Sequence, residues 1–252
     1  MNPPLISCIV PVFNGERYLK EALESIRAQT YRPLELIVAD DGSTDGTAAV
    51  AAGYGEQVRY LFQPNAGPAA ARNLGLTAAR GEFVAFLDHD DLWHPEKLAR
   101  QMARFQARPG LDLCFTHFQN FWMPDLAEEK KCYQEHPLSK PLSGYCIGTL
   151  VTRRAVFEKY GNFNEDLRQG ENIIWFLRAA EQGAITEILP DVLMHRRLHL
   201  DSQMRRGRSE LLDSFFLILK AWRDYQRPRF DKTDRLLSDL PNRLDIDSTP
   251  SR

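Results

Sequence analysis

The sequence lacks any long hydrophobic run. None of its apolar stretches approaches the roughly 20 residues that a helix needs to cross a bilayer. The first residues, MNPPLISCIVPVFN, have neither a basic start nor a long apolar segment. We therefore expect a cytoplasmic protein, and peripheral contact with the inner face of a membrane stays open.

The sequence also lacks an excess of charge of one sign, paired cysteines and a dinucleotide fingerprint. Its formal net charge is -2, so nothing indicates nucleic acid as a partner. The first apolar run is followed by PVFNGE, without the glycine pattern of a dinucleotide-binding dehydrogenase. We interpret the cysteines as reduced thiols with a structural role, because they lie far apart without a metal-site spacing. They are Cys8, Cys114, Cys132 and Cys146.

Strand and helix patterns alternate through the first hundred residues. Short apolar runs typical of buried strands lie at residues 5–13, 34–39, 58–62 and 83–87. Apolar residues at helical spacing follow at 18–26, with Asn14 as the expected cap, at 67–79 and at 95–107. This order predicts an α/β fold with a mostly parallel central sheet and helices on both faces. In such folds, ligands bind beyond the carboxyl ends of the strands.

The pattern becomes mixed after Pro109. A strand pattern at 111–121 is followed by a polar, irregular segment from Met123 to Lys140. A strand and a helix at 144–163, a helix at 171–182, a late strand at 191–199 and a helical stripe at 211–222 complete the series. We therefore predict a first half at 1–110, a smaller mixed half at 111–230 with a C-terminal helix, and a disordered tail at 231–252.

Polar side chains follow three of the predicted strands. They are Asn14 and Glu16, then Asp40 and Asp41, then Asp88, His89, Asp90 and Asp91. The carboxyl ends of parallel strands share one edge, so these groups are expected on one rim. Two carboxylates about 5 Å apart repel by roughly 3 kcal/mol at an effective dielectric near 20. Such a cluster favours a hard divalent cation, and Mg²⁺ or Mn²⁺ fits carboxylates best.

Five blocks in fixed order resemble family 2 glycosyltransferases with the GT-A fold, from Ile6 to about Met204. The blocks are ISCIVPVFNGERYLKEALESIRAQTY, LELIVADDGSTDGT, NAGPAAARNLGLTAARGEFVAFLDHDD, GEN before an LRAA helix, and RRLH. The resemblance implies a GT-A fold in which 1–110 binds a nucleotide sugar and 111–230 forms the acceptor side. It implies a metal-dependent, inverting transferase that uses a nucleotide diphosphate sugar and a hydroxyl acceptor.

The resemblance also implies which residues bind the nucleotide. Pro11 and Val12 would lie against the base, with Asn14 and Glu16 near its rim. Asp40, the first acid of DDGSTD, would read the uracil edge, because a carboxylate can accept a hydrogen bond from a ring N–H. The donor expected on this basis is a uridine diphosphate sugar.

The metal site is implied by a D-x-D element. Asp88, His89 and Asp90 fill it, which implies that Asp88 contacts ribose or metal and that Asp90 ligates Mn²⁺ or Mg²⁺ at the diphosphate. His199 matches a late histidine that similar enzymes bring to the metal or diphosphate. Arg72 has two open interpretations, contact with substrate or support of the loop that carries Gly67.

The expected catalytic pair departs from the family pattern. Similar enzymes place an aspartate base second in an ED pair that begins a helix, and here the pair is Glu171 and Asn172. An amide cannot usefully take up a proton near pH 7. Three interpretations are open: Glu171 is the base, transfer rests on positioning alone, or the chain binds a donor without turnover. The first of these is our working hypothesis.

Other functions and plainer roles compete with this interpretation. A catalytically degenerate module that binds a nucleotide sugar or a partner is the main alternative. An aspartyl phosphatase is disfavoured, because its motif would follow the first strand. Asp40 and Asp41 could cap the helix after them, and Asp91 could serve the start of the next helix. Many proteins of the family that this sequence resembles act in the assembly of surface polysaccharides, and the resemblance implies that pathway here.

Overall fold

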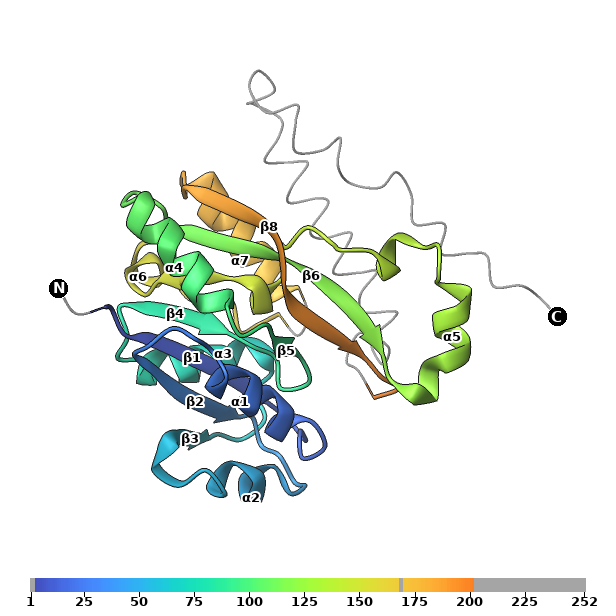
Figure 1. Ribbon diagram of the computed structural model, residues 1–252. Helices are drawn as coiled ribbons and strands as arrows, with labels where there is room; N and C mark the ends of the chain where they lie inside the picture. The colour runs from blue at the N-terminus through green and yellow to red at the C-terminus, as the bar shows by residue number, and fades with distance from the viewer. Residues whose placement is uncertain (1–2, 168–169, 202–252) are drawn as a thin grey trace.

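The computed structural model describes residues 3–167 and 170–201, and one eight-stranded sheet runs through them (Figure 1). The strand order is β3-β2-β1-β4-β7-β6-β8-β5. The strands are β1 (Ile6–Val12), β2 (Leu34–Asp40), β3 (Val58–Phe62), β4 (Phe83–Phe86), β5 (Leu92–Trp93), β6 (Leu113–Trp122), β7 (Val151–Arg153) and β8 (Thr186–Leu198). The helices are α1 (Leu19–Arg27), α2 (Thr47–Ala52), α3 (Pro68–Ala78), α4 (Lys97–Ala107), α5 (Ala127–Cys132), α6 (Ala155–Tyr160) and α7 (Glu171–Glu181).

The sheet is mixed. β3, β2, β1 and β4 are parallel neighbours, and β6 is parallel to β8. β7 runs antiparallel to β4 and β6, and β5 runs antiparallel to β8. Val12 pairs with Asp40 at the ends of β1 and β2, so the polar residues that follow these strands start from one edge. The predicted α/β class is confirmed.

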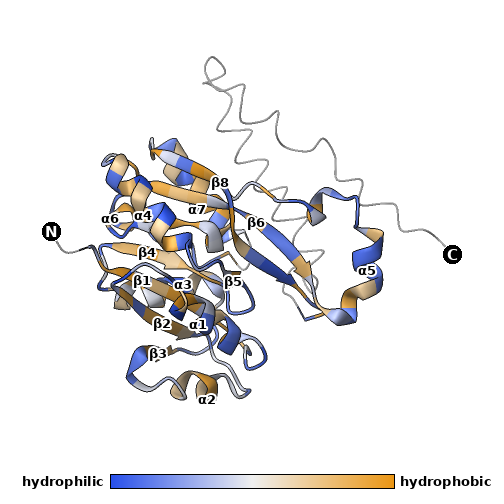
Figure 2. Ribbon diagram, viewed as in Figure 1, coloured by the Kyte–Doolittle hydropathy of each residue, from blue (hydrophilic) through white to orange (hydrophobic). Residues whose placement is uncertain are grey.

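Helices cover both faces of the sheet because its strands bury alternate side chains on opposite sides. Cys8 and Val10 of β1 pack with residues of α1 and α4, whereas Ile9 packs in a second cluster with residues of α3, α6 and α7. The strands β1, β2 and β4 are correspondingly apolar in Figure 2. The core therefore fixes the strand ends that carry the polar residues.

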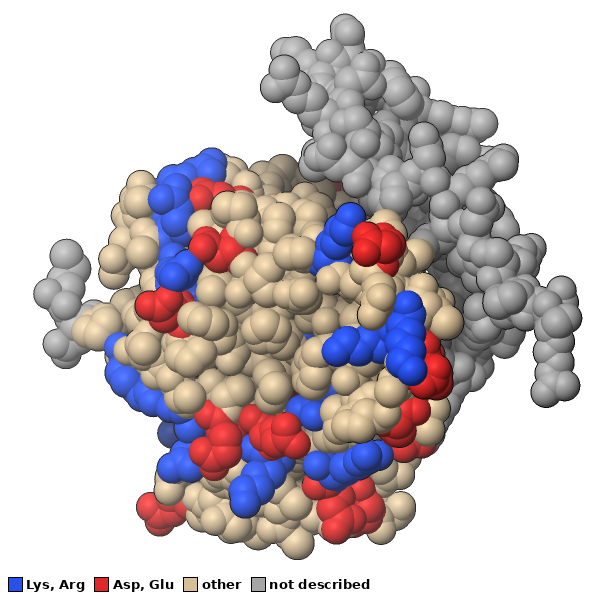
Figure 3. Space-filling view, turned by 45° about the vertical axis from the view of Figure 1, so that its right-hand side comes forward, with Lys and Arg blue, Asp and Glu red and all other residues tan. Residues whose placement is uncertain are grey.

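β6 and β8 extend beyond the rest of the sheet toward α5 (Figure 1). The apolar start of β6 gives way to polar residues along this extension (Figure 2). The segment predicted as irregular, Met123 to Lys140, contains α5 and short 3-10 turns. On the face drawn in Figure 3, Lys and Arg are interspersed with Asp and Glu around a broad uncharged area. This face carries no field of one sign.

Three local predictions were wrong. Asn14 does not cap α1: its φ is 51°, and Tyr18 precedes the first helical residue, Leu19. α4 begins at Lys97 rather than at Pro95. The two-residue strand β5 was missed, because its pairing depends on the distant β8. The stripe at 211–222 and the tail at 231–252 lie outside the described residues, and the division at residue 110 stays a prediction.

The four cysteines are free thiols. Burial raises the pKa of Cys8 to about 12 and the pKa of Cys114 to about 11, so both stay protonated near neutral pH. Both side chains belong to the interior, as predicted for structural thiols. Within residues 3–167 and 170–201, no helix is long and apolar enough to span a membrane.

Candidate active site

The loops after β1 and β2 are joined by hydrogen bonds. The backbone N–H of Asn14 donates to Ser43 Oγ at 2.8 Å, and the N–H of Thr44 donates to Asn14 Oδ1 at 2.8 Å. The N–H of Gly46 donates to Glu16 Oε2 at 2.9 Å. Asn14 and Glu16 therefore shape the loop of DDGSTD, and their predicted contact with a nucleotide stays a prediction.

Asp40 and Asp41 do not cap the helix that follows them, so that interpretation was wrong. Asp40 is fully buried, and its carboxylate accepts from the N–H of Ser43 at 2.8 Å and the hydroxyl of Tyr60 at 2.7 Å. Asp41 accepts from the N–H groups of Ala66 and Gly67 at 2.9 and 2.8 Å. Asp41 thus anchors the chain at the start of α3.

The D-x-D element packs against the loop after β1. A Cβ placed on Gly15 would lie 2.3 Å from Val12 Cγ2 and 2.6 Å from His89 Cδ2. The His89 ring therefore needs a glycine opposite it. Pro11 and Val12 are buried in β1. The structure thus brings Val12 and His89 together on the predicted rim.

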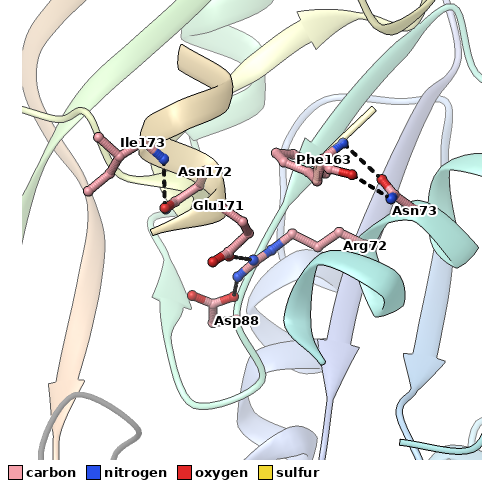
Figure 4. A network of polar contacts seen from close by, with 7 residues as sticks. All are labelled: Arg72, Asn73, Asp88, Phe163, Glu171, Asn172 and Ile173. Carbon is pink, nitrogen blue, oxygen red and sulfur yellow. Dashed lines mark hydrogen bonds and ion pairs between the residues drawn. The ribbon is translucent and has the colours of Figure 1, made fainter. Parts of the chain in front are cut away.

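Arg72 links the D-x-D element to α7 (Figure 4). The residue is 5% exposed, and its guanidinium donates to Asp88 Oδ1 at 2.8 Å and to Glu171 Oε1. Burial alone would lower the pKa of Arg72, but the carboxylates of Asp88 and Glu171 outweigh it and raise that pKa. The side-chain contacts of Arg72 go to Asp88 and Glu171, whereas the N–H of Gly67 donates to Asp41. The bridge joins residues 99 positions apart in the sequence.

Glu171 and Asn172 begin α7 after Gly170, whose φ of 74° suits a residue without a side chain. Glu171 is buried against Arg72, whereas Asn172 is partly exposed. Asn172 Oδ1 accepts from the N–H of Ile173 at 2.9 Å (Figure 4). The two members of the pair therefore differ in access: one is engaged by a cation and the other borders solvent.

Asn73, next to Arg72 on α3, fixes the segment before α7. Its side chain donates to the carbonyl of Phe163 at 2.9 Å and to Glu165 Oε1 at 2.7 Å, and accepts from the N–H of Phe163 at 3.1 Å (Figure 4). Asn73 is thus a structural clamp. Together with Arg72, it ties the two halves of the site to one helix.

Asp90 and His199 meet at the other side of the acidic run. Asp90 Oδ2 lies 3.1 Å from His199 Nε2. Burial disfavours the charge of Asp90, but the hydrogen bond with His199 and the charges of His89 and His199 outweigh it, so the pKa of Asp90 is lowered. Burial and the charges of Asp90 and Asp88 raise the pKa of Asp91 well above its usual value. Asp91 accepts from the N–H of Arg197 at 2.9 Å and does not serve α4.

Arg197 is engaged by the protein itself rather than turned toward a phosphate. It donates to Glu21 Oε2 and to the carbonyl of Asp90, both at 2.8 Å, and its guanidinium carbon lies 4.5 Å from the Tyr18 ring centre. Arg197 is therefore part of the framework that holds the acidic run. This contact could not be predicted from the sequence, because Glu21 and Arg197 are 176 positions apart.

The residues implied for a metal fit it in part. Asp90 and His199 bring a carboxylate and an imidazole together, donors that suit Mn²⁺. His199 Nδ1 is buried without a hydrogen-bond partner. In the described part of the chain, no group of three or more His, Cys, Asp or Glu is arranged to hold a metal, since Asp88 is turned to Arg72. Substrate oxygens would have to complete the coordination.

The fold and the D-x-D rim are those of the predicted GT-A type. Residues 7–165 match the model of glycosyl transferase family 2, and the chain belongs to this family. An uncharacterized glycosyltransferase of Rickettsia typhi is 34% identical over 186 residues, which are 69% of this chain and 58% of that protein. The chain thus spans little more than half the length of that relative.

Two solved structures have the same fold. S. aureus TarS in complex with UDP-GlcNAc has a TM-score of 0.68 at 23% identity, over 84% of this chain and 65% of that one. The mannosyltransferase PcManGT from Pyrobaculum calidifontis, in complex with GDP-Man and Mn²⁺, has a TM-score of 0.66 at 24% identity, over 89% and 66%. At these identities the likeness establishes the fold alone.

Proposed function

We propose that this chain is a metal-dependent, inverting glycosyltransferase that moves a sugar from a uridine diphosphate sugar to a hydroxyl of a saccharide or lipid-linked saccharide. The observation that carries the proposal is the Arg72 bridge, which brings Asp88 of the D-x-D element and Glu171 of the predicted catalytic pair to one guanidinium. Membership in family 2 and the UDP-GlcNAc complex of TarS support the donor class. Surface polysaccharide synthesis at the inner face of a membrane is the setting we propose.

The donor would lie over the ends of β1, β2 and β4. Pro11 and Val12 would face the base and Asp40 its uracil edge, with Asn14 and Glu16 at the rim. Because these two side chains are already fixed by the second loop, this half of the site is preorganised.

Asp90 and His199 would hold Mn²⁺ or Mg²⁺, and Asp88 would join them only on turning from Arg72. The ion would supply neutralisation of the charge that develops on the leaving diphosphate. The Mn²⁺ complex of PcManGT supports this choice of cofactor. His89 would keep the D-x-D loop against Gly15, where a side chain would collide with its ring.

Glu171 is our candidate for the base. The acceptor oxygen would attack the anomeric carbon from the side opposite the diphosphate while its proton passes to the Glu171 carboxylate, and the bond to the diphosphate oxygen would break. Arg72 would orient that carboxylate through its contact with Oε1. Asn172, beside it and more accessible, would bind the acceptor through its amide.

The test is a comparison of Glu171→Gln with Asn172→Asp. We expect Glu171→Gln to lower kcat by roughly 100-fold or more, the range of a lost general base, with unchanged affinity for UDP in calorimetry. Asn172→Asp places a carboxylate at the usual base position and should restore activity to the double variant. Glu181→Gln, which changes an exposed carboxylate at the far end of α7, is the control. An unchanged kcat in Glu171→Gln removes Glu171 from the mechanism.

A second candidate is a module that binds a nucleotide sugar without turnover. It is favoured by one observation, that Glu171 is held by Arg72 while Asn172 is an amide. UDP binding that depends on Mn²⁺ and is lost in Asp90→Asn, without release of UDP from any UDP-sugar, would select this candidate. Absence of binding to UDP, GDP and dTDP would contradict both.

A further inference from the structure

Tyr145 is an exposed aromatic residue on the acceptor side of the site. Its side chain is 48% exposed, although the residues on either side of it are wholly or partly buried. The other exposed aromatic residues in the described part of the chain, Phe13 and Phe62, follow or end strands of the donor half. Among the described residues, Tyr145 is therefore the exposed aromatic side chain on the acceptor half.

The loop that carries Tyr145 is rigidly held. Leu142 exchanges two backbone hydrogen bonds with Phe118 of β6, at 2.8 and 3.0 Å. A Cβ on Gly144 would lie 1.7 Å from the carbonyl oxygen of Thr116, so only glycine fits there. The hydroxyl of Thr149 lies 2.7 Å from the carbonyl oxygens of Gly144 and Cys146. The ring is thus presented without the entropy cost of ordering a mobile loop.

A chain of aromatic contacts links this ring to α7. Tyr145 packs on Phe115 with ring centres 5.2 Å apart, and Phe115 packs edge-on against Phe176 at 5.1 Å. Phe176 lies on the same face of α7 as Asn172 and Ile173, because residues three and four apart are neighbours on a helix. Ile173 is 38% exposed, and it follows Asn172 in the first turn of α7 (Figure 4).

The loop that carries Tyr145 also contacts the strand that follows the acidic run. Nε1 of Trp93 donates to the carbonyl of Gly148 at 2.8 Å, and Trp93 belongs to β5, which begins directly after Asp91. The segment 145–148 therefore joins β5 on one side and, through Phe115, α7 on the other. An aromatic ring here borders the space in which an acceptor hydroxyl would meet the donor sugar.

We propose that Tyr145 is the stacking platform for a pyranose ring of the acceptor, with Ile173 as the apolar edge of the same subsite. The proposal rests on the proposed transferase function and narrows its acceptor to a saccharide that presents an apolar C–H face. A pyranose has such a face on one side and hydroxyls around its edge, so it can lie on the ring and direct a hydroxyl toward Glu171. Asn172 is placed to hydrogen-bond another hydroxyl.

The experiment uses the full chain with UDP and Mn²⁺ and a panel of methyl β-pyranosides of glucose, galactose and N-acetylglucosamine as acceptor probes. Ligand-observed NMR measures their affinity, and release of UDP from UDP-sugars measures transfer. Tyr145→Ala should raise the Kd and the acceptor KM roughly tenfold, which corresponds to about 1.4 kcal/mol. Tyr145→Phe keeps the stacking face and should retain the affinity, as should the distant control Phe62→Ala.

The outcomes separate this proposal from the proposed function. Unchanged UDP affinity together with weaker pyranoside binding in Tyr145→Ala supports the platform. Equal pyranoside affinity in Tyr145→Ala and wild type overturns it and leaves the donor site intact. Failure of the pyranosides alongside binding of a prenyl or acyl chain also overturns it, since the apolar edge then serves a lipid. Loss of UDP binding in the wild type contradicts the proposed function itself.

Discussion

One cation is buried at the rim of the site and another in the interior beneath α4, and their pKa values shift in opposite directions. On the rim, Arg72 meets two carboxylates, and its pKa is raised despite burial. In the interior, Lys97 is fully buried with no carboxylate contact: its Nζ donates to Gln101 Oε1 at 2.9 Å and lies 4.3 Å from the Trp93 ring centre. Burial lowers the pKa of Lys97 to about 7.

The difference distinguishes a buried cation that is paired with carboxylates at a binding site from a buried cation that has no such partner. Desolvation disfavours both cations. On the rim, the carboxylates of Asp88 and Glu171 offset the desolvation of Arg72. Among the described residues, Lys97 has no such partner. A permanently charged bridge can position substrate-facing carboxylates, whereas Lys97 can become neutral and remain part of the core.

Removal of the rim cation tests this contrast most strongly. Arg72→Met would leave Glu171 buried and unpaired beside Asp88, so we expect a loss of about 3–5 kcal/mol in the free energy of unfolding, typical of a broken buried pair. Urea denaturation measures it. Arg27→Met is the matched control, because the Arg27 and Glu24 side chains are 42% and 48% exposed and their pair is worth roughly 1 kcal/mol or less. Equal losses in the two variants would break the comparison.

The pH dependence of stability tests the interior cation. The pKa of Lys97 is about 7 when folded and 10.5 as its ordinary value, so above pH 7 the unfolded chain binds more protons and the free energy of unfolding rises with pH. From pH 7 to 8.5 we expect a rise of roughly 2 kcal/mol. Above that range the buried thiols of Cys8 and Cys114 act in the opposite direction, since their pKa values are raised.

Lys97→Met should flatten this rise, and the difference between the two pH profiles of urea denaturation isolates Lys97 from other groups. Lys131→Met is the control, since the Lys131 side chain is 65% exposed. A wild-type profile that stays level from pH 7 to 8.5 would mean that Lys97 keeps its charge. The interior would then resemble the rim, and the contrast between them would fail.

Features that depend on neighbouring residues could be predicted from the sequence, whereas contacts between distant segments could not. β3 was predicted at its observed bounds and the start of α3 was predicted from Gly67 and Pro68, because strand periodicity and turn chemistry are local. Asp88 and Asp90 were predicted at a strand end for the same reason. The bridge from Arg72 to Glu171 could not be predicted, because it depends on how α3 and α7 pack across 99 positions. The role of Asn14 was missed because its partners belong to another loop.

Arg197 provides an intermediate case and the smallest expected effect. It is buried, but its carboxylate partner Glu21 is 55% exposed at the side chain and can be hydrated when the arginine is removed. Arg197→Met would lose the hydrogen bond to the carbonyl of Asp90 and the contact with the Tyr18 ring. We expect a loss of roughly 1–2 kcal/mol in urea denaturation. The loss should exceed that of Glu21→Gln, because that variant keeps both remaining contacts.

The size of this loss relative to Arg72→Met decides between two views of the acidic run. If partner burial sets the cost, Arg197→Met stays well below Arg72→Met, and only the rim bridge is built around charge. An equal loss in the free energy of unfolding would instead mean that the two arginines stabilise the fold equally. The backbone of Asp90 would then depend on Arg197 as strongly as the side chain of Asp88 depends on Arg72, and the acidic run would be a single unit held from two sides.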